Sequence, residues 1–116
     1  MADIKFTSNV NDILQRMEKG KRNALTAIGA TAETHTKENI TADKLVDTGR
    51  LRNSISHSVD GEAAYIGTNV EYAPYLELGT KKITAHHYLK RAVTEHKDEY
   101  KNLTAQAIQN AVNNSQ

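Results

Sequence analysis

The sequence predicts an α+β domain in which a long N-terminal helix and a long C-terminal helix pack on a small antiparallel sheet. Apolar residues recur every three or four positions over residues 9–40 and again over 87–112, the period of an amphipathic helix. Between them, residues 46–86 hold the only proline and short alternating runs that are typical of strands joined by turns. This order of elements favours two helices against a β-meander or hairpin.

Length and composition fit a single domain spanning residues 1–116. Hydrophobic residues make up 38% of the chain, with no Trp and one Phe, which predicts a thin core of the kind often supported by oligomerisation. The absence of cysteine excludes disulfides and thiolate chemistry. No apolar run approaches the roughly 18 residues that cross a bilayer, so we expect no membrane partner.

The net charge of +1 is spread evenly along the chain, unlike the basic face of a strong nucleic-acid binder. The one local cluster is Lys19, Lys21 and Arg22, which is either a solvated helix face or a phosphate-contacting surface. A small DNA-contacting or regulatory protein that uses these three residues is therefore the alternative function.

The N-terminal helix is expected over residues 9–40. Residues 1–8 alternate polar and apolar and are expected to form an extended arm or an edge strand, with Ser8 or Asn9 as the helix N-cap. Gly20 and Gly29 weaken this helix by about 1 kcal/mol each relative to alanine, and a bend is expected near Gly20. Its apolar stripe comprises Val10, Ile13, Leu14, Met17, Ala24, Leu25, Ile28, Ala32 and His35, interrupted by Lys21.

In the central region, Ser54–Val59 and Glu62–Gly67 read as strands joined by a two-residue turn at Asp60-Gly61 with positive φ. That turn pairs His57 with Ala64. The face expected to cover a helix consists of Ile55, His57, Val59, Glu62, Ala64 and Ile66.

A short helix is expected over Pro74–Leu78, ended by Gly79 in a positive-φ conformation. Lys81–Ala85 is a candidate third strand, and the helical period resumes from about His87.

Asp47-Thr48-Gly49 resembles the active-site triplet of aspartic proteases, in which two carboxylates share a proton. Two features argue against that chemistry: such enzymes are almost wholly β, and Arg50 would depress the pKa of the carboxylate. Asp47 as a turn cap and Gly49 as a positive-φ residue are the preferred interpretation.

His86, His87 and His96 invite a metal site, yet no cysteine or carboxylate completes a recognisable ligand spacing. We therefore expect no catalytic residue, metal, cofactor or small-molecule substrate. Tyrosines are instead concentrated between residues 65 and 88, where they would serve as interface anchors or close a thin core. The tyrosines concerned are Tyr65, Tyr72, Tyr75 and Tyr88.

Three blocks resemble, in order, the signature of a phage family of head–tail joining or tail-completion proteins from long-tailed bacteriophages and prophages. They are VDTGRLRNSI at 46–55, YIGTNVEYAPYLELGT at 65–80 and AHHYLKRA at 85–92. Two departures are Leu45 in place of the usual proline and His86-His87-Tyr88 where Arg-Pro-Phe is common.

The resemblance implies a structural virion protein that completes the tail and joins it to the DNA-filled head, as a ring around the DNA channel. It would act in the neck of the virion after assembly in the host cytoplasm. Its partners would be copies of itself and other neck and tail proteins, such as a tail terminator and head-closure or adaptor proteins. DNA would pass nearby without specific binding.

We expect one contact surface of the ring to be formed by the loop at 47–52 and the helix at 72–80. Arg50 or Arg52 would pair there with Glu71 or Glu77, within or between subunits. The residues expected in this surface are Asp47, Thr48, Gly49, Arg50, Arg52, Glu71, Tyr72, Tyr75, Glu77, Gly79 and Thr80.

Overall fold

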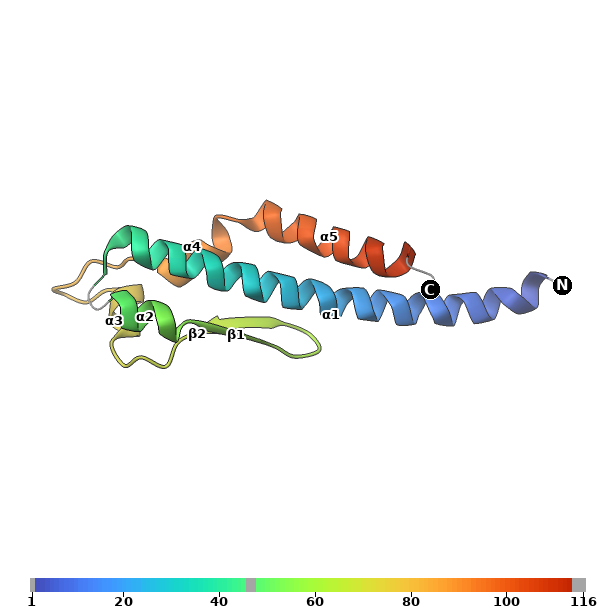
Figure 1. Cartoon of the computed structure of the whole chain (residues 1–116), viewed down its shortest axis with the longest axis horizontal. Helices are drawn as coiled ribbons and strands as arrows, with labels where there is room; N and C mark the ends of the chain where they lie inside the picture. The colour runs from blue at the N-terminus through green and yellow to red at the C-terminus, as the bar shows by residue number, and fades with distance from the viewer. Residues whose placement is uncertain (1, 46–47, 114–116) are drawn as a thin grey trace.

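The structure, a computed structural model, describes the backbone of residues 2–45 and 48–113 and the side chains within 10–45 and 49–113. The molecule is a rod of 72 × 23 × 23 Å organised on one helix (Figure 1). It contains five helices and one two-stranded sheet in the described part of the chain, which confirms the α+β class. No described helix is both long enough and apolar enough to span a bilayer.

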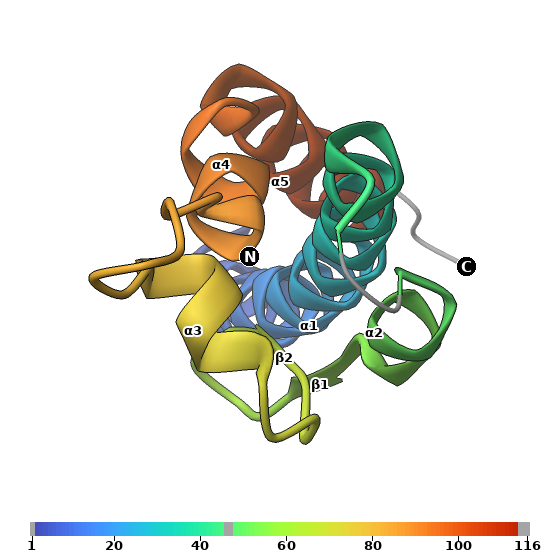
Figure 2. The same cartoon turned by 90° about the vertical axis from the view of Figure 1, so that its left-hand side faces the viewer.

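Helix α1, Ala2–Asp43, runs the length of the rod, and its 42 residues span about 63 Å. The end view shows α4 and α5 on one side of α1 (Figure 2). Helix α2 and the hairpin lie on another side of α1. The extended arm predicted for residues 1–8 is wrong, as is the N-cap at Ser8 or Asn9, because α1 already begins at Ala2. A five-residue alternation is a weak signal, and an existing helix gains one backbone hydrogen bond for each residue it adds.

Helix α2, Thr48–Ser54, occupies a segment that was expected to be a loop and the start of a strand. Leu51 and Ile55 are four residues apart, and both are buried. Gly49 lies inside α2 without a positive φ, so the left-handed conformation predicted for it is wrong. The segment is helical because one turn brings both apolar side chains into the core.

The hairpin consists of β1, Ser56–Val59, and β2, Ala64–Gly67. Val59 pairs with Ala64 and His57 with Ile66, so the predicted register is wrong by two residues. The Asp60 side chain causes the shift, because its Oδ1 accepts hydrogen bonds from the amides of Glu62 (2.7 Å) and Ala63 (2.8 Å) and closes a longer loop. Gly61 does not have the positive φ that the two-residue turn needed.

A shift of two residues leaves the alternation of side chains unchanged, so the predicted inner face still turns toward α1. Ile55 is buried and the inward residues of both strands are half-buried, whereas Glu62 is exposed. His57 packs against Gly29 of α1, where a Cβ would lie 2.8 Å from the His57 Cδ2. Its Nδ1 also lies 2.9 Å from Glu33 Oε1.

Helix α3, Ala73–Leu78, ends at Gly79 with φ of 80°, which confirms that prediction. The candidate third strand at Lys81–Ala85 is wrong, because that segment is an irregular loop. The Thr80 amide donates to the Ile83 carbonyl, and the amides of His86 and His87 that follow the loop donate to α3.

The single C-terminal helix predicted over 87–112 is divided into α4, Tyr88–Thr94, and α5, Lys97–Asn113. Both pack along α1 and not on the sheet as predicted for the C-terminal helix. The break redirects α5 along α1, and the Tyr100 hydroxyl donates across it to the Ala92 carbonyl (2.5 Å).

The core lies at the end of the rod where α1, α2, α3 and α4 meet. Ile40, Leu51 and Tyr88 are completely buried there. The Tyr88 hydroxyl donates to the Ala73 carbonyl (2.9 Å), Asn39 Nδ2 donates to the Tyr88 carbonyl (3.0 Å), and burial raises the pKa of Tyr88 to about 12. Tyr88 is therefore a core residue.

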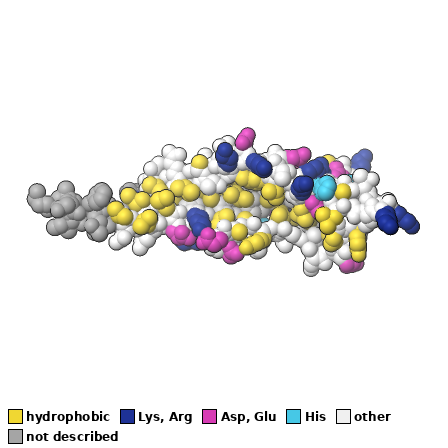
Figure 3. Space-filling model, turned by 180° about the vertical axis from the view of Figure 1, so that it is seen from behind, with side chains coloured by type: hydrophobic (Ala, Val, Ile, Leu, Met, Phe, Trp, Pro, Cys, Tyr) yellow, Lys and Arg dark blue, Asp and Glu magenta, His cyan; other side chains and the backbone are white. Residues whose placement is uncertain are grey.

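The opposite end of the rod is much less covered. Helix α5 has no buried side chain among its described residues, and α1 projects beyond it (Figure 1). The view from behind shows apolar side chains exposed along this part of the rod (Figure 3). We call the exposed part of α1 the α1 stripe; it comprises Val10, Ile13, Leu14 and Met17, which are 40–58% exposed.

Replacing Gly20 with alanine should force α5 away from α1, because the added Cβ would lie 2.8 Å from the Ile108 Cα. We expect the free energy of unfolding to fall by about 1–3 kcal/mol, measured by chemical denaturation. Gly49→Ala is the matched control, since nothing lies within 4 Å of its Cβ position. It should leave stability unchanged or raise it by up to about 1 kcal/mol. Equal effects of the two substitutions would contradict the close α1–α5 contact.

Candidate assembly surface

The expected contact residues gather at the end of the rod that carries α2 and α3. Arg50 in α2 reaches across to Glu71, with its Nη2 3.3 Å from Oε2 and 3.4 Å from Oε1. The Arg50 guanidinium also lies over the Tyr72 ring, 5.5 Å from its centroid. Both charged side chains are more than half exposed, so the ion pair contributes no more than about 0.5 kcal/mol. The predicted pairing of Arg50 with Glu71 is thus present within one chain.

The same end carries exposed apolar side chains. Tyr75 is 56% exposed, Leu78 71% and Ile83 38%. Tyr75 and Leu78 are three residues apart on the outer side of α3, whereas Ala73 and Leu76 on its inner side are buried. We call Arg50, Glu71, Tyr72, Tyr75, Leu78, Thr80 and Ile83 the end surface.

Sequence reasoning missed Leu78 and Ile83. In a six-residue helix with apolar residues on both sides, the spacing does not show which side is inward. Ile83 lies in the segment predicted as a third strand, which is a loop in the structure.

Glu77 has a different environment from Glu71. Its side chain is only 13% exposed, and its two oxygens accept hydrogen bonds from the amides of Leu89 (2.8 Å) and Lys90 (3.1 Å). These amides belong to the first turn of α4, so the Glu77 carboxylate caps that helix. Glu77 therefore acts within the chain by joining α3 to α4.

Gly79 and Thr80 shape the loop that follows α3. A Cβ at Gly79 would lie 2.9 Å from the Ala85 amide nitrogen, in addition to its positive φ. Thr80 Oγ1 accepts hydrogen bonds from the amides of Lys82 and Ile83, both at 3.1 Å. The two residues together hold Ile83 at the surface.

The structure separates the remaining expected residues. Arg52 is exposed and lines a shallow groove against α1 with Glu33 and Glu38, away from Arg50. Asp47 lies outside the described residues. Thr48 begins α2, so this part of the triplet is helical and does not lie in the β-loop of an aspartic protease.

The basic residues Lys19, Lys21 and Arg22 of α1 have different environments. Lys21 Nζ lies 3.0 Å from Glu62 Oε2 in the hairpin loop, and this hydrogen bond raises the pKa of Lys21. Lys19 and Arg22 are exposed. Lys21 therefore connects α1 to the hairpin, which weakens the interpretation of the cluster as a phosphate-binding surface.

The three histidines singled out in the sequence do not meet. His86 Nδ1 lies 3.5 Å from Asp43 Oδ2, which also receives Arg91 Nη2 at 2.5 Å. His87 Nδ1 lies 3.9 Å from Glu77 Oε2. His96 instead stacks on His35 of α1, with ring centroids 3.5 Å apart.

The end surface combines aromatic and aliphatic anchors with a rim of charge, the composition of a protein–protein contact. The rod also leaves apolar side chains exposed at its other end, in the α1 stripe.

The comparisons with known proteins identify the family of this chain. The profile of the HK97-gp10-like family, described as a bacteriophage HK97-gp10 tail component, matches residues 4–79. The chain belongs to this family, and its place is therefore in the virion as a tail component. No curated protein and no solved structure matches the chain. The matched range covers α1, α2, the hairpin and α3, and it includes most of the end surface.

Glu77→Ala should lower the free energy of unfolding by about 1–2 kcal/mol, because the amides of Leu89 and Lys90 lose their acceptor. Glu71→Ala removes a carboxylate from the same end of the rod, but its exposed pair should change stability by no more than about 0.5 kcal/mol. Thermal and chemical denaturation of the two variants measure these changes in stability. A Glu71 variant as unstable as the Glu77 variant would contradict this division between a cap and a surface residue.

Proposed function

We propose that this protein completes the phage tail and joins it to the DNA-filled head, as a ring-forming component of the neck. The observation that supports this role most directly is the end surface, which concentrates Tyr75, Leu78 and Ile83 beside the Arg50–Glu71 pair. A contact rich in exposed aromatic and aliphatic side chains suits an assembly that forms once and persists. Catalytic turnover has no part in this function.

A ring needs two different surfaces on each subunit, one that meets the other on the next copy. The end surface is the first. The second is the α1 stripe at the other end of the rod, where Leu14 is 58% exposed and Met17 45%. We propose that the end surface of one copy packs on the α1 stripe of its neighbour, which would cover the apolar side chains that the single chain leaves exposed.

The remaining partners follow from charge and position. The net charge of +1 and the engagement of Lys21 with Glu62 favour a ring that surrounds DNA without binding it specifically. Surfaces not used between copies are then available to the neighbouring neck and tail proteins, among them a tail terminator and a head-closure or adaptor protein.

Deleting the gene from the phage or prophage that encodes it should yield filled heads and separate tails, seen by electron microscopy of lysates. Complementation with Tyr75→Ser should restore few joined particles, because an anchor of the end surface is lost. Tyr65→Ser is the matched control: Tyr65 is equally exposed, at 55% against 56%, but lies on the hairpin. Complete virions from the deletion would refute the joining function.

Mixing two variants tests the head-to-tail contact. Leu78→Asp damages the end surface and Leu14→Asp the α1 stripe, and neither side chain is part of the core. Each variant alone should remain monomeric in sedimentation experiments under conditions where the wild-type protein assembles. Mixed in equal amounts, they should form a one-to-one complex, because each supplies the surface that the other lacks. Failure of the mixture to pair would exclude this arrangement while leaving the joining function itself untouched.

A further inference from the structure

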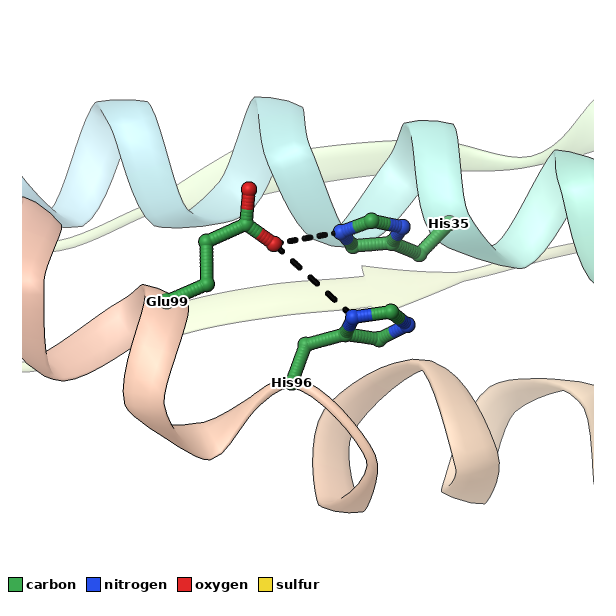
Figure 4. A group of neighbouring side chains, drawn as sticks. All are labelled: His35, His96 and Glu99. Carbon is green, nitrogen blue, oxygen red and sulfur yellow. Dashed lines mark hydrogen bonds and ion pairs between the residues drawn. The ribbon is translucent and has the colours of Figure 1, made fainter.

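Two histidines and a glutamate meet where α1 passes the link between α4 and α5 (Figure 4). His35 comes from α1, His96 from the link and Glu99 from the first turn of α5. Glu99 Oε1 lies 2.6 Å from His35 Nε2 and 3.8 Å from His96 Nδ1. One nitrogen from each ring and one carboxylate oxygen all lie within 4.8 Å of one another.

A second carboxylate contacts the other ring nitrogen of His35, Nδ1. Glu38 Oε1 lies 3.0 Å from His35 Nδ1, one turn along α1. Histidines that bind metals usually donate their other ring N–H to a carboxylate or carbonyl, which fixes the tautomer and the direction of the free nitrogen. Glu38 is placed to do this for His35, so that Nε2 faces the space shared with His96 and Glu99.

We propose that His35, His96 and Glu99 bind a divalent first-row metal ion, for which Zn²⁺ is the best fit. Two imidazoles and one carboxylate form a known three-ligand set for zinc, with water in the fourth position. Ligand atoms about 2.1 Å from a tetrahedral ion lie about 3.4 Å apart. The Glu99 oxygen lies closer than this to His35 Nε2 (2.6 Å) and farther from His96 Nδ1 (3.8 Å). The ion would replace the direct contact between Glu99 and His35.

Binding requires a rotation of one ring. The two imidazoles are stacked with their planes 2° apart, so their in-plane lone pairs cannot point at one ion. His96 lies between α4 and α5, outside either helix, so we assign the rotation to this ring. Tyr100 packs edge-on against both rings, at 6.4 and 6.5 Å, and bounds the site on the α5 side.

The site would add a link between α1 and the start of α5. Helix α5 has no completely buried side chain among its described residues, and its apolar side chains that face α1 are only half-buried. An ion held by His35 of α1, His96 of the link and Glu99 of the first turn of α5 would fix the position of α5. This inference does not rest on the proposed joining function.

The test uses the full-length protein after treatment with a chelator, titrated with Zn²⁺ in a calorimeter and with Co²⁺ in a spectrophotometer at neutral pH. We expect one ion per chain, a higher melting temperature, and visible Co²⁺ absorption of a low-coordinate site. His96→Ala and Glu99→Ala should each weaken Zn²⁺ binding at least about tenfold, and Glu38→Gln should weaken it less. His57→Ala is the matched control, because His57 also pairs with a glutamate, Glu33, but on the hairpin side of α1.

The absence of saturable Zn²⁺ binding up to about 1 mM would overturn the proposal. Equal loss of binding in His57→Ala and His96→Ala would also overturn it. Should a variant fail to fold, NMR of the wild-type protein decides, since bound Co²⁺ must broaden the imidazole signals of His35 and His96. Broadening centred on His86 and His87 would place the ion elsewhere and refute the site.

Discussion

The close approach of other elements to α1 is the constraint on which the rest of the structure depends. Gly20 lets the backbone of α5 come so near that a Cβ would lie 2.8 Å from the Ile108 Cα, and Gly29 makes similar room for His57. The two glycines are nine residues apart, which is two and a half helical turns and places them on opposite sides of α1. One helix can therefore hold α5 on one side and the hairpin on the other.

The larger elements could be predicted from the sequence because each depends on a local signal. The three-and-four spacing in α1 and the positive φ of Gly79 after α3 follow from nearby residues alone. The hairpin was predicted on its correct face but in the wrong register, because the Asp60 side chain closes a loop longer than the Asp-Gly pair suggested. Helix α2 was missed because its seven residues become helical by burying Leu51 in a core formed by distant segments.

In the candidate surface, too, the features that depend on distant segments could not be predicted. The pairing of Arg50 with Glu71 was among the options expected for the contact surface that the resemblance implies, and the structure contains it. Glu77, expected beside them, is largely enclosed, because it binds the first amides of α4, and that helix begins eleven residues later in the chain. The cluster of His35, His96 and Glu99 could not be predicted, because His35 lies 61 positions before His96 in the sequence and only the path of α5 along α1 brings them together.

Helix α3 has one side exposed to solvent and one side packed in the core. Its outer side presents Tyr75 and Leu78, while Glu77 between them holds the first turn of α4 by two hydrogen bonds. A mechanical load applied to the outer side of α3 would pass through Glu77 into α4 and on to α1 through the Arg91–Asp43 ion pair. The short helix can thus carry tension into the longest element of the chain without relying on the exposed loop at 80–86.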